Sequence, residues 1–350
     1  MIREGIQKLI DGTNLTYEES CIVMSEVMSG KATNAQTAAF LTGLRMKGES
    51  IEELIAFASV MRDHCHQIHP KVSGRLVDTC GTGGDKLKTF NVSTIAAFVI
   101  AGAGVAVAKH GNRSVTSKSG SADVLEKLGL NLTTPPQTVQ TIIEQIGVGF
   151  MFAPAFHPAM KYAMETRREI GVRTVFNLLG PLTNPACASA QLLGVYDHKL
   201  VMPITHALQK LGCEEAMVVH GLDGLDEIST IGKTLLVHLK DGQTTKTLFS
   251  PKDFGIKKAD IAELYCHSVE ENAEIMFSIL NNKTLGAKRD VVLVNSAAGI
   301  LIGGKASNFK EALELAHTSI NSGAAYKKLR ELIKASSGNI EPLKTLEANQ

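Results

Sequence analysis

VDTCGTGGDKLKTFNVSTIAAFVIAGAGVAVAKHGNRSVTSKSGSADVLEKLG, residues 77–129, decides the fold of most of this chain. Its first half is a short apolar strand, a glycine-rich loop and then a helix. Gly81, Gly83 and Gly84 carry no side chain, so their backbone N–H groups can turn toward a bound anion without a Cβ in the way. The pattern predicts an anion-binding turn between a strand and a helix.

Polar side chains collect where that helix begins. Thr89, Asn91, Ser93 and Thr94 come just before the apolar run Ile95 to Ile100. A helix start carries unpaired N–H groups and a partial positive charge, both of which favour phosphate. The loop and the helix start are therefore expected to bind phosphate together.

A second polar segment, Lys109 to Ser121, has almost no apolar content. Its polar members are Lys109, His110, Asn112, Arg113, Ser114, Thr116, Ser117, Lys118, Ser119 and Ser121. Cations and hydroxyls beside a glycine-rich turn indicate a ligand with more than one phosphate group. Packing alone also explains many glycine-rich turns, GTGGD matches neither GxGxxG nor GxxxxGK[ST], and polar runs are often solvated loops. The two segments together favour phosphate.

Strands and helices alternate from residue 75 onward. Strands are predicted at 76–78, 105–108 and 148–152, and helices at 93–101, 122–128 (capped by Ser121) and 136–146. Such alternation predicts a mostly parallel sheet flanked by helices, with ligands at the carboxyl ends of the strands. Both polar segments fall at such ends.

The first seventy residues show only helical patterns. Helices are expected at 2–10, up to Met28, at 35–46 with Asn34 as cap, and at 51 to about 65. Thr16 with Glu19 and Ser50 with Glu53 form capping boxes. We predict a small all-helical domain, residues 1–70, joined in space by part of 158–188, and a large α/β domain, residues 71–350.

The rest of the chain continues the alternation. A helix is predicted at 159–170, a connecting or hinge portion at 172–185, strands at 190–195, 215–219 and 234–239, and a hairpin through Asp241-Gly242 to a strand at 245–249. Helices follow at 270–280, 290–302, 308–321 and 324–335, and the last dozen residues are expected to be frayed. His64 to His69, HCHQIH, lacks metal-ligand spacing and indicates solvated histidines near a helix end.

Composition excludes several functional classes. With 36 basic and 35 acidic residues the formal charge is +1, which argues against a surface that coats nucleic acid or a membrane. No secretory leader and no membrane-spanning stretch is recognised, so a soluble cytoplasmic protein is expected. Six scattered cysteines suggest neither a zinc site nor a disulfide framework.

Asp226 and Glu227 form an acidic pair among glycines, just after the apolar strand at 215–219. Adjacent carboxylates at a strand end suit Mg²⁺, which prefers oxygen ligands and often shares them with substrate phosphates. Adjacent acids are also common on ordinary surface loops. Spacing alone leaves both interpretations open.

Several long segments resemble one known family. VDTCGTGGD, NVST, KHGNRSVTSKSGSADVLEKLG, RREIGVRTVFNLLGPLTNP and RDVVLVNSAAGILIGGKA are similar, in order and over nearly the whole chain, to the anthranilate phosphoribosyltransferases of tryptophan biosynthesis. The resemblance implies transfer of the 5-phosphoribosyl group of phosphoribosyl pyrophosphate to the amine of anthranilate. N-(5-phosphoribosyl)anthranilate and pyrophosphate would be the products.

The resemblance also implies site residues. Those for phosphoribosyl pyrophosphate would be Gly81, Gly84, Asp85, Thr89, Asn91, Ser93, Thr94, Lys109, His110, Gly111, Asn112, Arg113, Ser114, Val115, Thr116, Ser117 and Ser121. Gly81, Asn112 and Arg167 would contact anthranilate, and Ser93, Asp226 and Glu227 would hold Mg²⁺, with two ions per subunit. A guanidinium pairs well with a carboxylate, but Arg167 is also placed for a surface ion pair with Glu165 or Glu169.

The implied chemistry is a Mg²⁺-assisted displacement without a covalent enzyme intermediate. A neutral arylamine is already nucleophilic, so no catalytic residue is assigned, with His110 and Lys109 as candidates. A homodimer through the helical domain is implied, and association with anthranilate synthase components is left open. Alternative interpretations are a pyrimidine nucleoside phosphorylase and a related nucleic-acid-binding protein without activity, which the near-zero charge and the intact motifs disfavour.

Overall fold

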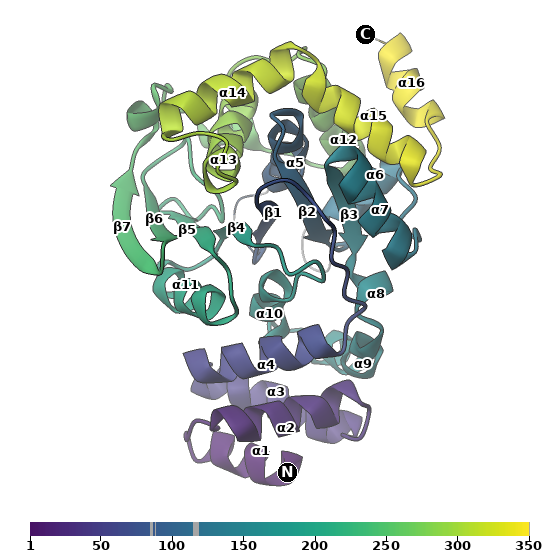
Figure 1. Cartoon of the computed structure of the whole chain (residues 1–350). Coiled ribbons are helices and arrows are strands. Elements are labelled where there is room, and N and C mark those ends of the chain that lie inside the picture. Colours follow the sequence, from purple (N-terminus) through teal and green to yellow (C-terminus); the bar gives the residue numbers. More distant parts are fainter. Residues whose placement is uncertain (85–86, 88, 115–118, 350) are drawn as a thin grey trace.

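Four helices form the bundle at the N-terminus of the computed structural model, which describes residues 1–84, 87, 89–114 and 119–349 (Figure 1). They are α1 (Ile2–Ile10), α2 (Tyr17–Met28), α3 (Asn34–Lys47) and α4 (Ile51–Asp63). The capping boxes predicted for α2 and α4 are confirmed. For α3 the predicted cap was wrong: Thr33 is the N-cap, because Gln36 completes a capping box with it, and the Asn34 side chain instead donates to Glu165 Oε2 at 3.1 Å.

A single sheet of seven strands, in the order β3-β2-β1-β4-β5-β6-β7, forms the centre of the larger part. The strands are β1 (Leu76–Gly81), β2 (Ala106–Gly111), β3 (Val148–Phe152), β4 (Ala190–Gly194), β5 (Glu215–Gly221), β6 (Thr234–Lys240) and β7 (Gln243–Phe249). The first five in space are parallel, and β6 and β7 form the predicted antiparallel hairpin. The predicted fold class, a small helical domain and a mostly parallel α/β domain, is confirmed.

Helices cover both faces of the sheet (Figure 1). They are α5 (Val92–Gly102), α6 (Ser121–Lys127), α7 (Pro136–Ile146), α8 (Ala153–Phe156), α9 (Lys161–Ile170), α10 (Phe176–Leu182), α11 (Val201–Lys210), α12 (Val269–Leu280), α13 (Ala287–Ile302), α14 (Phe309–Asn321), α15 (Ala324–Ala335) and α16 (Glu341–Ala348). Short 3₁₀ turns lie at Pro158–Met160, His198–Leu200, Pro251–Phe254 and Ile261–Leu264.

Two sequence predictions about these elements, the Ser121 cap and the frayed C-terminus, were wrong, and two others gain detail from the structure. Ser121 is the first residue of α6 rather than its cap, because Gly120 N–H donates to Asp123 from the N-cap position. The helix at 159–170 is split into a 3₁₀ turn and α9, and the connecting portion contains α10. The last residues are helical rather than frayed, because Leu343 of α16 is buried against the core.

The bundle and the sheet share one apolar core. Leu54 and Phe57 of α4 belong to the same buried cluster as Leu179 of α10, Leu208 of α11 and Val218 of β5. Two helices come from the segment 158–188: α10 lies between α4 and the sheet, and α9 lies beside the bundle, where it packs against α2 and α3 (Figure 1). The boundary at residue 70 stays a prediction.

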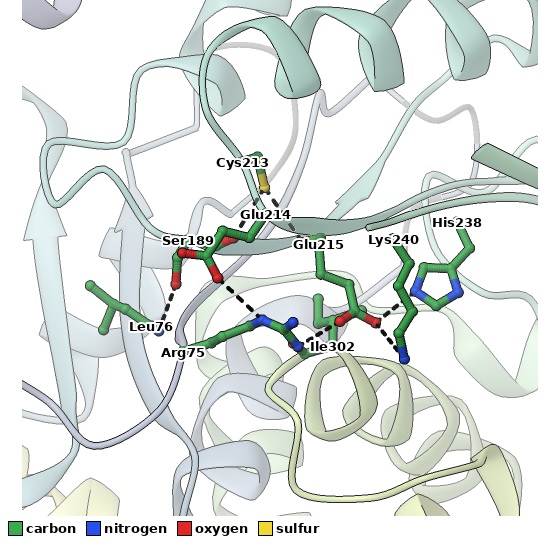
Figure 2. A network of polar contacts seen from close by, with 9 residues as sticks. All are labelled: Arg75, Leu76, Ser189, Cys213, Glu214, Glu215, His238, Lys240 and Ile302. Atoms are coloured by element: carbon green, nitrogen blue, oxygen red, sulfur yellow. Dashed lines mark hydrogen bonds and ion pairs between the residues drawn. The ribbon is translucent and has the colours of Figure 1, made fainter. Parts of the chain in front are cut away.

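A polar network closes the amino edge of the sheet (Figure 2). Arg75, just before β1, pairs with the buried carboxylate of Glu215 on β5 at 2.5 Å, and His238 of β6 lies 2.8 Å from the other oxygen of Glu215. The guanidinium of Arg75 also donates to the carbonyl of Ile302 at 3.2 Å. These contacts hold three strands together at the edge away from the predicted site.

No helix in the described part of the chain is both long and apolar enough to cross a membrane.

Candidate active site

The acidic loop after β5 packs directly on the ends of two neighbouring strands. Gly81 of β1 and Gly194 of β4 are paired in register. A Cβ on Gly81 would lie 2.4 Å from Asp226 Oδ2, and one on Gly194 would lie 1.5 Å from the backbone oxygen of Asp226. These two glycines are therefore required for the acidic loop to reach the carboxyl edge of the sheet.

Both acidic side chains accept hydrogen bonds from the predicted phosphate-binding segment. Gly83 N–H donates to Asp226 Oδ2 at 2.9 Å, and Ser93 N–H, in the first turn of α5, donates to Glu227 Oε1 at 3.2 Å. Burial raises the pKa of Asp226, while the Gly83 N–H lowers it. Carboxylates, a serine hydroxyl and backbone N–H groups thus meet at one place although they are far apart in the sequence.

Lys109, at the end of β2, is buried beside the same helix start. Its Nζ donates to the Thr79 carbonyl at 2.5 Å and lies 3.4 Å from Ser93 Oγ. Burial lowers the pKa of Lys109, and the nearby carboxylate of Asp78 raises it. Burial conversely raises the pKa of Asp78, and Lys109 lowers it. Each charge therefore compensates part of the other's cost of burial.

Asn272 of α12 joins the two polar segments. This fully buried side chain accepts from Asn91 N–H at 3.2 Å and donates to Asn91 Oδ1 at 2.7 Å and to Ser119 Oγ at 2.8 Å. Sequence reasoning missed it, because an asparagine within a helical pattern looks like any other polar position. The structure shows that it fixes one predicted ligand-binding segment to the other.

Asn295 of α13 fixes the acidic loop in a similar way, and sequence reasoning missed this residue too. Its amide accepts from Ile228 N–H at 2.9 Å and donates to the Ile228 carbonyl at 3.0 Å. Ile228 directly follows Glu227, so this clamp sets the direction of the acidic pair. The sequence offered one hint of this role: an amide side chain within the mostly apolar predicted helix at 290–302.

The segment after β2 folds back on the start of α6. Arg113 pairs with Asp123 at 3.1 Å and with Glu126 at 2.6 Å, and Ser114 N–H donates to Asp123 at 3.0 Å. The Asn112 carbonyl accepts from Ala122 N–H at 3.2 Å. Arg113 was predicted to contact phosphate, and in this arrangement its guanidinium already has two carboxylate partners.

The remaining predicted residues are placed as follows. Gly84 lies beside Gly83, Gly111 ends β2, Thr89 bridges to Tyr265, Thr94 is buried in α5, and Ser121 begins α6. Asp85, Val115, Thr116 and Ser117 lie outside the described residues. In the described ranges no cluster of three or more His, Cys, Asp or Glu side chains is arranged to hold a metal.

His110 and His157 form a buried pair next to Lys109. Their ring centroids are 5.0 Å apart. Burial lowers the pKa of His110 to about 3 and that of His157 to about 4. The backbone of Gly180 acts in the opposite direction on the pKa of His110, and that of Thr183 on the pKa of His157, but burial is the larger effect in both rings. Both rings are neutral at pH 7, and His110 is therefore a weak base.

Arg167 lies in the last turn of α9, apart from the loop contacts above. Its guanidinium carbon is 5.0 Å from the centre of the Phe176 ring, and burial lowers its pKa. No ion pair of Arg167 with Glu165, Glu169 or any other carboxylate is found in the part of the chain that the structure describes. No hydrogen bond joins it there to Gly81 or Asn112. A half-buried cation without a carboxylate is a good receptor for an anionic ligand.

The fold and these contacts place the chain in a class of glycosyl-transferring enzymes. Residues 3–65 match the helical bundle domain of a glycosyl transferase family, and residues 73–326 match the a/b domain of that family. Over 338 residues the chain is 52% identical to an anthranilate phosphoribosyltransferase of Methanocorpusculum labreanum, covering 97% of this chain and 99% of the relative. Another, from Petrotoga mobilis, is 49% identical over 95% of this chain and 96% of the relative.

Two solved structures share the fold. Anthranilate phosphoribosyltransferase of Thermus thermophilus superposes with a TM-score of 0.89 at 40% identity, covering 95% of this chain and 99% of that one. The enzyme of Saccharomyces cerevisiae in complex with PRPP and Mg gives 0.87 at 29% identity, covering 96% and 98%. The chain belongs to the anthranilate phosphoribosyltransferase family.

Proposed function

We propose that this enzyme catalyses displacement of pyrophosphate from phosphoribosyl pyrophosphate by the amine of anthranilate, in tryptophan biosynthesis. The observation that carries the proposal is the meeting of the glycine-rich loop, the start of α5 and the acidic loop, joined by the Gly83–Asp226 and Ser93–Glu227 hydrogen bonds. The relatives named above carry this activity in their names, and the yeast structure binds PRPP and Mg.

The donor set at this edge fits magnesium. Asp226, Glu227 and Ser93 offer oxygen atoms only, and Mg²⁺ bound together with substrate phosphates needs just one or two carboxylates. We propose that these three residues hold Mg²⁺, with two ions per subunit. When bound, the ion would neutralise charge on the pyrophosphate group.

The chain's own residues bind and orient the two substrates in this proposal. The backbone of Gly81 and Gly84, the α5 start and buried Lys109 surround the pyrophosphate group, and Arg167 pairs with the anthranilate carboxylate. Neutral His110 and His157 add no charge that would compete with the cations. No step uses a covalent enzyme nucleophile, because positioning of a neutral arylamine and stabilisation of the leaving group supply the rate.

The remaining proposals concern the whole protein. The helical domain would close over the site and exclude water that hydrolyses the sugar phosphate. We further propose a cytoplasmic homodimer joined through the helical domain, which binds neither nucleic acid nor membranes. Association with anthranilate synthase components remains to be tested by co-purification.

The test follows anthranilate fluorescence in purified protein mixed with anthranilate, phosphoribosyl pyrophosphate and Mg²⁺. Loss of fluorescence that requires the sugar phosphate and stops with EDTA is the expected result. If folded protein leaves the fluorescence unchanged, the proposal fails. Assays with thymidine plus phosphate and with labelled DNA then test the phosphorylase and nucleic-acid alternatives.

A further inference from the structure

Arg173 lies in the chain segment between α9, which carries Arg167, and α10, and it has no role in the account above. It follows α9 and the left-handed Gly171 that ends this helix, and it precedes Phe176 at the start of α10. Its Nη2 donates to the carbonyl oxygen of Gly84 at 2.5 Å. Its guanidinium carbon is 4.7 Å from the centre of the Tyr196 ring. One side chain thus touches the glycine-rich loop and the segment after β4.

The glycine-rich loop is shaped around this guanidinium. A Cβ on Gly84 would lie 1.8 Å from Arg173 Nη2, whereas a Cβ on neighbouring Gly83 would meet no heavy atom within 4 Å. Both glycines have left-handed backbones, with φ of +82° and +65°. A side chain at either glycine would therefore be strained by the left-handed backbone, but only a side chain at Gly84 would also clash with Arg173.

The segment that carries Tyr196 is itself hydrogen-bonded to the glycine-rich loop. Tyr196 N–H donates to Thr82 Oγ1 at 3.1 Å, and Thr82 N–H donates to the Gly194 carbonyl at 2.9 Å. Arg173 is therefore stacked on a ring whose own backbone is fixed to the glycine-rich loop. Among the described residues no carboxylate lies within ion-pair distance of Arg173, so its direct contacts are a carbonyl and a ring, while its charge also acts on Asp226, whose pKa it lowers.

The other end of the segment leads to Arg167. Thr174 N–H donates to Asn177 Oδ1 at 3.1 Å just before α10, and the ring of Phe176, the first residue of α10, stacks with the guanidinium of Arg167. The chain between Arg167 and Phe176 is thereby fixed at both ends and held to the loop in its middle by Arg173.

We propose that Arg173 is a positioning residue that fixes the glycine-rich loop at Gly84 to the segment carrying Arg167, so that one contact orders both substrate sites. The inference rests on the proposed function. It distinguishes Arg173 from Arg167, which is assigned to anthranilate alone. Loss of the contact loosens the phosphate-binding loop and the anthranilate-binding arginine together.

The first experiment compares Arg173→Ala, Arg173→Lys and, as matched control, Arg168→Ala, an exposed arginine on the neighbouring helix. Arg173→Ala is expected to raise the Michaelis constants of both substrates about tenfold or more, because misplacement of binding groups weakens productive binding. Arg173→Lys keeps a donor for the Gly84 carbonyl and recovers part of the loss. Arg168→Ala leaves both constants unchanged.

A second experiment tests the contact itself by a double-mutant cycle. Gly84→Ala and Gly83→Ala carry the same left-handed strain, but only the first clashes with Arg173. Gly84→Ala is expected to weaken phosphoribosyl pyrophosphate binding, measured by calorimetry with Mg²⁺, far more than Gly83→Ala. In an Arg173→Ala background the two substitutions are expected to have nearly equal effects.

Each outcome decides the matter. Unchanged Michaelis constants in Arg173→Ala overturn the inference, as does a Gly84→Ala effect that is the same in both backgrounds. A rise for phosphoribosyl pyrophosphate alone would make Arg173 a direct phosphate ligand and also overturn it. Wild-type protein is assayed first: no transfer there refutes the proposed function, whereas normal transfer with normal Arg173→Ala refutes only this inference.

Discussion

Two carboxylates in the acidic loop occupy positions that few other side chains could take. Asp226 packs against Gly81 and Gly194 and accepts a hydrogen bond from the Gly83 N–H, while Glu227 accepts one from the N–H of Ser93. Partial burial of a carboxylate costs stability, and such cost is typical of functional sites.

Asp226→Asn together with Glu227→Gln is expected to lower turnover by about 100-fold or more while leaving the fold intact, because the charges proposed to hold the metal are lost. Turnover and thermal unfolding are both measured. A control double variant, Glu52→Gln with Glu274→Gln, removes two exposed charges elsewhere and should retain activity. Normal activity in the first variant would remove the magnesium assignment.

Arg167→Ala is expected to raise the Michaelis constant for anthranilate about tenfold or more and that for phosphoribosyl pyrophosphate much less. A guanidinium–carboxylate pair in a half-buried site is directional and strong. Steady-state kinetics with each substrate varied provide the measurement, and exposed Arg168→Ala is the control. Equal changes in both constants would mean that Arg167 is structural.

The buried histidine pair predicts a loss of stability in acid. The pKa of each ring is lowered from 6.5, to about 3 in His110 and about 4 in His157. Between those values and 6.5 the unfolded chain binds more protons than the folded one, so stability falls as pH falls, by about 1.4 kcal/mol per histidine per pH unit.

His157→Gln should therefore reduce the drop in melting temperature between pH 7 and pH 5, measured by circular dichroism. Asp78 and Asp226, whose pKa values are raised by burial, contribute with the opposite sign but equally in both proteins. The exposed His69→Gln variant serves as control. A wild-type-like drop in His157→Gln would show that the pair does not titrate as described.

Helices far along the chain hold the loops of the site. Asn272 of α12 and Asn295 of α13 are fully buried, and each accepts a hydrogen bond from a backbone N–H, that of Asn91 and that of Ile228. A buried amide that is fully paired fixes direction, and its loss leaves backbone groups without partners.

Asn295→Ala is expected to destabilise the protein by about 3 kcal/mol, because the N–H and carbonyl of Ile228 lose their partners. Turnover should fall and the required Mg²⁺ concentration should rise. Ser296→Ala is the matched control on the same helix: among the described residues its hydroxyl donates to the Val292 carbonyl, so its loss costs about 1 kcal/mol and leaves the Mg²⁺ requirement unchanged. An unchanged Mg²⁺ requirement in Asn295→Ala would contradict the clamp.

The molecule as a whole brings its proposed ligand groups together from the carboxyl ends of β1, β2 and β5. The continuous core between bundle and sheet means that ligand binding stabilises a unit larger than the loops. Phosphoribosyl pyrophosphate at 100 times its dissociation constant should add about 2.7 kcal/mol of stability.

That stabilisation is expected as a rise in melting temperature, measured by scanning calorimetry, which needs Mg²⁺ and disappears with EDTA. The Asp226→Asn, Glu227→Gln double variant should show little rise. A rise of the same size with EDTA would mean that the sugar phosphate binds without the metal.

Local sequence patterns determined much of this protein. Capping residues, apolar periodicity and the Asp241-Gly242 turn place most helices and strands, because each depends on hydrogen bonds within a few residues. The glycine-rich loop and the polar helix start likewise indicate phosphate from adjacent residues. The substrate, the metal and the site residues followed from family resemblance rather than from spacing.

Tertiary structure alone decided which distant groups meet. Asn91 and Asn272 are 181 positions apart, Gly84 and Arg173 are 89 apart, and Ile228 and Asn295 are 67 apart. Such contacts depend on the order of the strands in the sheet and on the packing of helices across it, which leave no local pattern in the sequence. The burial that lowers the pKa of His110 arises in the same way, since it needs neighbours from other elements.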